Sequence, residues 1–381
     1  MSRYDWMWLD LTEGIGDEAV FVNTIKALED HGINSILVNS GDVDFENHRS
    51  RRTKILSFPR SKIPFLNTLI SNYRASKILA KISVDEIPNF IMVNWKLLPG
   101  FLRARRKRRA DFEKCEVIIE DRSPPVGKGI KTWLQWRFYD YSWKKSLDNT
   151  DGGNVLVPSL EEFVRDRYGI KDSFEFIHTP SGVDVNRFRP TGGESSFESG
   201  VKIVYHGALD SGRGLRRIIP LLEELEKRGV PSKATIVGDG PLSGEFQKIS
   251  ERNPKVEFLG RVSFEELPSI VAENHYGILP LPDSLEWNVG SPLKIMEFAS
   301  SGLVCLTTDV AGTEPFSDNN WITRSDKYEP IHNWIDTIIE DYESEDEFKM
   351  KRVEAREFAI SKMTWDMALE SLLDLIMRGK Q

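Results

Sequence analysis

Short apolar runs alternate along the chain with longer segments of helical spacing. Buried strands are predicted at 5–11, 33–39, 88–95, 116–120, 154–158, 201–206, 233–237, 256–260, 276–281 and 303–307. Each half of the chain opens with a strand, a glycine-containing loop and a helix, which is typical of a doubly wound parallel sheet. We therefore predict an α/β protein, and the length of 381 residues suggests two domains. The polar stretch 191–200 fits a linker between them.

The segment 283–307 carries the most chemistry. Pro292 stands where a helix would begin and Gly302 where it would end, so a helix is predicted over 293–301. Free backbone N–H groups at such a start attract anions, and Lys294 lies in the first turn beside them. Glu297 follows on the same side, where it can accept hydrogen bonds from two ribose hydroxyls. A strand, a glycine loop, a helix start, one Lys and one Glu together indicate a sugar-nucleotide site.

The run 290–302 (GSPLKIMEFASSG) resembles the C-terminal signature of the GT-B glycosyltransferases of the glycogen-synthase/group 1 type, family 4. That family has two glutamates separated by seven residues, and the second holds the donor ribose. Glu297 matches the second glutamate, whereas the first would fall on Val289. Glu286 could substitute for it if the loop is longer.

Other motifs extend the resemblance over most of the chain. Residues 179–190 (TPSGVDVNRFRP) resemble the interdomain signature, and Thr364-Trp365-Asp366 resembles the closing motif. The resemblance implies a GT-B fold, in which two Rossmann-like domains face each other across a cleft and the last helix crosses back to the first domain. We place an acceptor-side domain at 1–185, a nucleotide-sugar-binding domain at 186–360 and the crossover helix at 361–381.

The resemblance also implies site residues. Arg213-Gly214 matches the cationic position that grips the donor diphosphate, while Ala208 stands where many members have an arginine. Residues 238–241 and 261–262 match the family pattern, and the latter stand where backbone groups hold the base. The expected donor-binding residues are Gly207, Arg213, Gly214, Gly238, Val262, Gly290, Ser291, Pro292, Leu293, Lys294 and Glu297.

Candidate catalytic residues follow the strand 116–120, because groups just past the carboxyl end of a parallel strand usually face the ligand. They are Asp121 and Arg122, with Glu286 as the third, although the first two are equally consistent with a local ion pair. Gly14 and Gly16 are the candidate acceptor-side glycines. Their spacing before Ala19 also fits a loose NAD fingerprint, but Asp17 and Glu18 would repel a pyrophosphate.

No cofactor or metal is expected. No His/Cys cluster has metal-ligand spacing, and Asp42-Val43-Asp44 is best explained as a chance match to a metal motif. Cys115 and Cys305 stand alone in predicted strands and are expected to be buried thiols in a reducing compartment. With no long apolar span and no signal peptide, we expect a cytoplasmic protein.

The net charge of −8 is unevenly distributed. Residues 1–150 carry 25 Lys and Arg against 19 Asp and Glu, whereas residues 151–381 carry 26 against 40. A predicted helix over 97–110 ends in Arg103, Arg105, Arg106, Lys107, Arg108 and Arg109. This basic end is either a solvated helix end or a patch that binds an anionic membrane or a phosphate-bearing acceptor. The aromatic helix predicted over 129–147 is interpreted as core packing rather than a sugar platform.

The predicted function is transfer of a sugar from a UDP-, GDP- or ADP-linked donor to a glycan, lipid-linked or phosphate-bearing acceptor. The resemblance implies retention of configuration, and the chain's own cations make a metal unnecessary. Two rivals stay open: a non-hydrolysing sugar-nucleotide 2-epimerase on the same fold, and a nucleic-acid- or membrane-binding module built on the basic helix. No nucleic-acid partner is expected.

Overall fold

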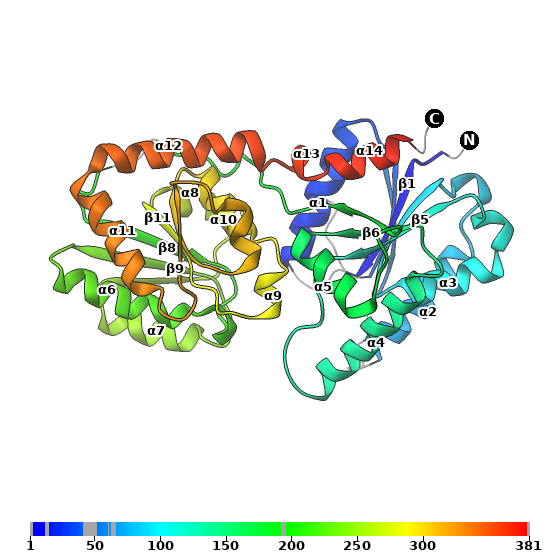
Figure 1. The fold of residues 1–381 in the computed structure, drawn as a ribbon, viewed down its shortest axis with the longest axis horizontal. Helices are drawn as coiled ribbons and strands as arrows, with labels where there is room; N and C mark the ends of the chain where they lie inside the picture. Colours follow the sequence, from blue (N-terminus) through cyan, green and yellow to red (C-terminus); the bar gives the residue numbers. More distant parts are fainter. Residues whose placement is uncertain are drawn as a thin grey trace. The chain divides into compact units, whose positions relative to one another are not determined.

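The computed structural model describes residues 3–11, 15–40, 52–59, 61, 66–191 and 196–378, except for the side chains of 15–19. The chain forms two compact units (Figure 1). Unit 1 comprises Met1–Pro180 with Ala368–Gln381, and unit 2 comprises Ser181–Met367.

Unit 1 is built on a seven-stranded, all-parallel sheet in the order β3-β2-β1-β4-β5-β6-β7. The order reverses between β1 and β4, which makes the sheet doubly wound. Its strands are β1 (Trp6–Leu11), β2 (Ser35–Ser40), β3 (Thr53–Phe58), β4 (Phe90–Asn94), β5 (Glu116–Asp121), β6 (Gly152–Val155) and β7 (Glu175–His178). Its helices are α1 (Ile15–Asp30), α2 (Asn67–Leu79), α3 (Leu98–Lys107), α4 (Ile130–Ser146), α5 (Pro158–Tyr168) and α14 (Glu370–Arg378), with 3-10 turns at Val84–Glu86 and Arg109–Phe112.

The central strands of unit 1 are buried along their whole length, as expected for a sheet that is covered on both faces. All six residues of β1 and of β2 are buried. Two tryptophans of β1, Trp6 and Trp8, stack with ring centroids 5.7 Å apart. The edge strand β3 is only partly covered and ends the sheet.

Unit 2 repeats this plan with six parallel strands in the order β10-β9-β8-β11-β12-β13. The strands are β8 (Val201–His206), β9 (Ser232–Val237), β10 (Val256–Gly260), β11 (Tyr276–Leu279), β12 (Val304–Thr308) and β13 (Ile322–Ser325). The helices are α6 (Ile218–Lys227), α7 (Ser243–Arg252), α8 (Leu267–Ala272), α9 (Leu285–Asn288), α10 (Leu293–Ser300), α11 (Ile331–Glu343) and α12 (Glu345–Lys362). Three 3-10 helices, η4 (Ser211–Arg213), η5 (Leu215–Arg217) and η6 (Ala311–Phe316), lie in its loops.

The two sheets confirm the predicted fold class, and most predicted strands begin and end within two residues of the observed ones. The C-terminal helix α14 packs against β7 and belongs to unit 1, after the short α13 (Trp365–Ala368). Cys115 and Cys305 are buried and unpaired, and burial raises the pKa of both thiols. In the described parts of the chain, no helix is both long and apolar enough to cross a membrane.

Candidate functional site

The order of strands in unit 2 reverses between β8 and β11, and the predicted donor residues gather at the carboxyl ends of these strands. Gly207 follows β8, and a Cβ added there would lie 2.5 Å from Cε of Lys294. Gly238 follows β9 with φ +136°, and a Cβ there would lie 1.9 Å from the carbonyl oxygen of Gly207. Only residues without a side chain allow this approach. The two loops therefore pack tightly and leave room for Lys294 above them.

The start of α10 faces the same loops. Pro292 precedes the first helical residue, Leu293, so the N–H groups of Leu293 and Lys294 have no partner within the helix, whereas Ile295 donates to the carbonyl of Pro292 at 3.0 Å. The hydroxyl of Ser291 accepts a hydrogen bond of 3.1 Å from the N–H of Ser181, which fixes the approach to the helix. Lys294 stands in the first turn, as predicted. This helix start can accept an anion.

Glu297 lies one turn further along α10 and is buried. Its Oε2 atom lies 3.3 Å from Nε2 of His206, the last residue of β8. Burial raises the pKa of Glu297 to about 7, against the opposing effect of Lys294 and Arg187. Burial, together with Lys294, lowers the pKa of His206 well below its usual value, so the imidazole is neutral. Nε2 of His206 makes no hydrogen bond in the described structure, so this contact leaves both carboxylate oxygens able to accept hydrogen bonds.

Lys294 and Arg187 act on this carboxylate, and Arg213 in turn acts on Lys294. Burial and the charge of Arg213 lower the pKa of Lys294 to about 8. Nε of Arg213 lies 2.8 Å from Oδ2 of Asp210, and its guanidinium lies 4.9 Å from the ring centroid of Trp287. Trp287 also donates its indole N–H to the carbonyl of Gly212 at 3.0 Å. The sequence predicted Arg213 and Lys294, and the structure brings them together.

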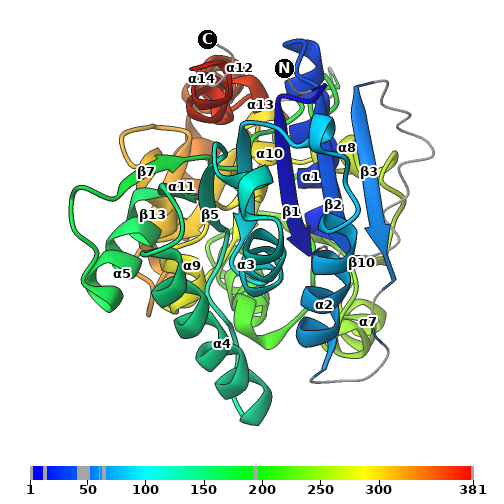
Figure 2. The same ribbon diagram turned by 90° about the vertical axis from the view of Figure 1, so that its right-hand side faces the viewer.

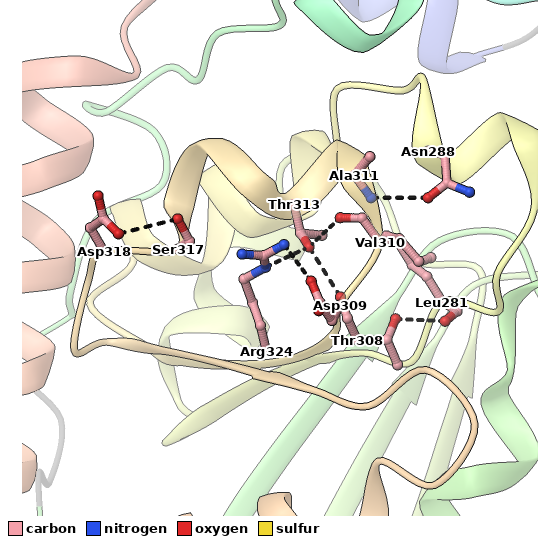
Figure 3. Close-up of polar contacts among 10 residues, drawn as sticks. All are labelled: Leu281, Asn288, Thr308, Asp309, Val310, Ala311, Thr313, Ser317, Asp318 and Arg324. Atoms are coloured by element: carbon pink, nitrogen blue, oxygen red, sulfur yellow. Dashed lines mark hydrogen bonds and ion pairs between the residues drawn. The ribbon is translucent and has the colours of Figure 1, made fainter.

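The segment after β12 forms a polar network (Figure 3). Arg324 donates from Nε to Oγ1 of Thr313 at 3.1 Å and pairs with Asp309 at 2.5 Å. The Thr313 hydroxyl lies 3.0 Å from the carbonyl oxygen of Thr308, whose own hydroxyl donates to the carbonyl of Leu281 at 2.5 Å. These contacts tie η6 to β13 and to the end of β11.

This network supports the loop that carries Trp287. The side-chain oxygen of Asn288 accepts a hydrogen bond of 2.9 Å from the N–H of Ala311 (Figure 3). A Cβ on Gly312 would lie 2.2 Å from the carbonyl oxygen of Trp287, so η6 and α9 are in close contact. The position of Trp287 over Arg213 therefore depends on η6 as well as on α9 itself.

His206 and Trp287 were not predicted as site residues from the sequence. His206 could have been predicted from its position, because it directly precedes Gly207 in the loop after β8. Trp287 could not be assigned, because its contact with Arg213 joins residues that lie 74 positions apart in the sequence. Val289 is buried beneath the loop. Glu286 lies half-buried on α9, and Val262 is half-buried after β10.

The predicted catalytic residues of unit 1 have other surroundings. Asp121 has no exposed surface, and it accepts hydrogen bonds from Tyr139 at 2.5 Å and from Trp143 at 2.9 Å. Within unit 1 this carboxylate anchors α4 to β5, and its catalytic role stays a prediction. Arg122 instead lines a small polar pocket and lies 3.5 Å from Oε1 of Glu120.

Gly14, Asp42 and Asp44 lie outside the described residues, and Gly16 is described only as part of α1. Among the residues described, no group of three or more His, Cys, Asp or Glu side chains could hold a metal ion.

The basic end of α3 is partly used within unit 1. Arg108 donates to the carbonyls of Leu79 and Ile82, and Arg105 donates to the carbonyl of Asn149. Four other members of the predicted patch are exposed, namely Arg103, Arg106, Lys107 and Arg109. Because α3 leads into the amino end of β5, this patch lies at the amino edge of the sheet, away from the carboxyl ends of the strands.

Comparison with known proteins agrees with this geometry. Residues 200–341 match the family model described as glycosyl transferases group 1. The putative glycosyltransferase EpsF of Bacillus subtilis (strain 168) is 26% identical over 176 residues, which are 43% of this chain and 44% of EpsF. The chain thus matches less than half of the length of this curated relative.

Solved structures resemble the whole chain. HepE of Anabaena, solved in complex with UDP, superposes with a TM-score of 0.71 at 14% identity and covers 99% of this chain and 100% of its own. Sucrose-phosphate synthase from Thermosynechococcus elongatus gives a TM-score of 0.74 at 13% identity over 98% of both chains. These two similarities are similarities of fold. The chain has the GT-B fold, and residues 200–341, within the unit that carries the candidate site, are similar to the group 1 glycosyl transferases.

Proposed function

We propose that this protein transfers a glycosyl group from a nucleotide sugar, with UDP as the favoured nucleotide, to a glycan acceptor. The observation that carries the proposal is the cluster of Arg213, Lys294 and Glu297 at the start of α10. Two cations beside a helix start suit a diphosphate, and a buried carboxylate suits the two hydroxyls of a ribose. The cluster lies at the carboxyl ends of the strands, where doubly wound sheets bind their ligands.

In this proposal the chain stabilises the leaving group. The bond between C1 of the sugar and the phosphate oxygen breaks, and negative charge grows on the diphosphate. Arg213, Lys294 and the N–H groups at the start of α10 face that charge. The acceptor hydroxyl forms the new bond to C1 and releases its proton, while the sugar passes through an oxocarbenium-like state. We further propose retention of the anomeric configuration, which the family resemblance implies, and catalysis without a metal.

Ligands of proteins with the same fold support the donor and the acceptor. HepE has been solved with UDP and with UDP-glucose. A variant of TarM from S. aureus has been solved with UDP, Fondaparinux and alpha-GlcNAc-glycerol. Because the charged cluster described above is suited to a nucleoside diphosphate, we extend a UDP-linked donor and a glycan acceptor to this chain.

The acceptor is proposed to bind at the carboxyl edge of the sheet in unit 1. A polar pocket of about 90 Å³ lies there, between the ends of β1, β4 and β5. Its polar lining consists of Asp10, Asn94, Lys96, Arg122 and Ser123. Glu120 lies behind it and accepts a hydrogen bond of 2.7 Å from the indole of Trp8. Such a pocket can bind hydroxyl groups of a sugar.

The proposal is tested by measuring nucleotide binding and by product analysis. Calorimetry with UDP, GDP and ADP should give a measurable affinity that is highest for UDP. Incubation with UDP-sugars should then yield a new glycoside only when a glycan acceptor is present. Failure to bind any of the three nucleotides would overturn the proposal. Conversion of the donor to its 2-epimer without an acceptor would assign the protein to the epimerases instead.

A further inference from the structure

The loop after β5 and the first turns of α4 form an exposed apolar surface, which we call the α4 tip (residues 126–137). Val126 is 49% exposed, Ile130 76%, Trp133 59% and Leu134 43%. In both views the N-terminal end of α4 extends beyond the other helices of unit 1 (Figures 1 and 2). Apolar side chains of this size seldom gather on a protein surface without a partner.

The exposed side chains follow helical spacing. Ile130, Trp133, Leu134 and Arg137 occupy positions i, i+3, i+4 and i+7, which lie on one side of a helix. The opposite side carries the buried Tyr139. The helix therefore has a buried side held by Asp121 and a second, apolar side with no core to cover it.

The tip is an ordered structure. Pro124 and Pro125 are buried before it, and Thr132 is buried within it. Gly129 has φ +96° and precedes the first helical residue, so the chain turns sharply at this point. The exposure of Ile130 and Trp133 is thus a consequence of a defined turn and helix.

The charge of the tip has a single sign. No Asp or Glu occurs between Asp121 and Asp140, whereas this interval contains four cations, namely Arg122, Lys128, Lys131 and Arg137. The last three of these are exposed. The guanidinium of Arg137 lies 5.8 Å from the ring centroid of Trp133. Apolar and aromatic side chains flanked by cations are suited to the boundary between lipid headgroups and acyl chains.

We propose that the α4 tip inserts into the interface of an anionic lipid membrane. Its apolar side chains would enter the acyl boundary while Lys128, Lys131 and Arg137 contact the headgroup phosphates. The tip lies at the carboxyl edge of the sheet, since α4 follows the end of β5. That is the edge that carries the polar pocket of unit 1, so a membrane on the tip would present lipid-borne acceptors on the same side. This last step rests on the proposed function, whereas membrane contact itself does not.

The basic end of α3 is the weaker candidate for the same contact. A groove of about 690 Å³ beside it contains Arg105, Arg106, Arg109 and Lys145. The same groove also contains Glu113, Asp148 and Asp151, which nearly balance those charges. Two exposed tyrosines lie near it: the ring of Tyr73 is 5.5 Å from the guanidinium of Arg103, and Tyr141 lines the groove. An anionic surface would therefore meet less net charge at this end.

The test is flotation of the full chain with lipid vesicles. Vesicles of phosphatidylcholine alone are compared with vesicles that contain phosphatidylglycerol, at low and high salt. The wild type should float with the anionic vesicles and less so at high salt. A variant with Ile130→Ser, Trp133→Ser and Leu134→Ser should lose roughly tenfold or more of this binding. Lys128→Ser with Lys131→Ser should reduce binding and its dependence on salt.

Matched controls separate the alternatives. Met350→Ser with Val353→Ser removes two similarly exposed apolar side chains, 58% and 56%, from α12 and should leave vesicle binding unchanged. UDP affinity and thermal unfolding of the tip variant should match the wild type, which shows that both units are intact. The inference is overturned if the wild type does not bind anionic vesicles or if the tip variant binds them equally well. If the variant with Arg106→Ser and Arg109→Ser loses vesicle binding and the tip variant keeps it, the membrane contact lies on α3. A concentration-dependent dimer that the tip variant abolishes, without vesicle binding, would show that a second copy covers the tip.

Discussion

At the scale of single residues, Glu297 combines burial with a functional charge. Its carboxylate is kept beside His206 and Lys294, where burial favours the neutral form and the cations favour the charged form. If the proposed function holds, the charged carboxylate accepts hydrogen bonds from both ribose hydroxyls, whereas protonation turns one of its oxygens into a donor and weakens this binding. Donor binding should therefore depend on the charge of this one residue.

Glu297→Gln should lower the affinity for UDP-glucose at least tenfold, because a hydrogen bond to a charged acceptor contributes roughly 1.5–3 kcal/mol. The pKa of Glu297 is raised to about 7 and that of Lys294 is lowered to about 8. Wild-type affinity should thus be highest between those values, falling below as Glu297 is protonated and above as Lys294 loses its proton. Calorimetry across pH measures both limbs.

The Glu297→Gln variant shows which residue is responsible for each limb of the pH profile of affinity. In Glu297→Gln the acidic limb should disappear and the alkaline limb should remain, since Lys294 is unchanged. Glu273→Gln, at an exposed position of unit 2, should behave as the wild type. An unchanged affinity in Glu297→Gln would remove this residue from the site.

Asp121 illustrates a carboxylate with a structural role. Burial raises its pKa to about 6 from 3.8, although Tyr139 and Trp143 donate to it. Because the folded state binds the proton more tightly than the unfolded state, the neutral form stabilises the fold fully below about pH 4. Between pH 4 and pH 6 the carboxyl group is ionised in the unfolded state but still protonated in the folded state. The free energy of unfolding should therefore fall by about 3 kcal/mol over this range, at 1.36 kcal/mol per unit of pKa.

Asp121→Asn should lack this contribution to the pH dependence. Urea unfolding at pH 4, 5, 6 and 7 gives the free energy for each protein, and the difference between wild type and variant should change by about 3 kcal/mol over that range. Asp172→Asn, at an exposed position of the same unit, controls for the loss of a charge. Parallel pH profiles for wild type and Asp121→Asn would show that Asp121 does not titrate in this range.

At the scale of elements, regular strands and long helices were predictable, and short elements were not. Strands such as β8 and β10 show continuous apolar runs whose ends coincide with glycine or polar residues. The four residues of α9 carry no such pattern, because their conformation depends on contacts with η6, including Asn288 with Ala311. For α4 the sequence predicted the helix, but it placed the core-packing side on Trp133 and Tyr141, which are exposed. The buried aromatic side chains are Tyr139 and Trp143, because aromatic residues occur on both sides of the helix.

The α9 loop should influence donor binding through Arg213. Trp287→Leu removes both the ring face beneath the guanidinium and the hydrogen bond to Gly212. A cation–π contact at a partly exposed site contributes roughly 0.5–1 kcal/mol, so UDP affinity should fall about two- to fivefold. Trp287→Phe keeps a ring face and should recover part of the loss. The measurement is calorimetric titration of both variants with UDP.

A double-mutant cycle distinguishes positioning from general disruption. In an Arg213→Ala background, Trp287→Leu should have little further effect, because the contact partner is already absent. Equal losses in both backgrounds would mean that Trp287 acts on the loop as a whole and not through Arg213.

At the scale of the whole molecule, the sequence predicted two doubly wound sheets and the position of the donor residues along them. It did so because glycine loops and helix starts have local signatures, and because the carboxyl ends of parallel strands meet at one edge. The sequence also showed that charge is unequally distributed between the two halves of the chain. Only the structure shows which basic residues, such as Arg108, make hydrogen bonds within unit 1. The exposed α4 tip follows from three-dimensional packing that no local pattern contains.

The last prediction concerns the whole reaction, namely that glycosyl transfer should survive removal of divalent metal ions. The leaving diphosphate needs positive charge, and Arg213, Lys294 and the start of α10 supply it from the chain itself. Initial rates are measured after treatment with EDTA and dialysis, with and without added Mg²⁺ or Mn²⁺, and should change less than twofold. Complete loss of activity that Mn²⁺ restores would contradict this prediction. In that case Asp42→Asn and Asp44→Asn would show whether those carboxylates bind the ion, since their loss should then raise the Mn²⁺ concentration required, whereas loss of the exposed Asp172 should not.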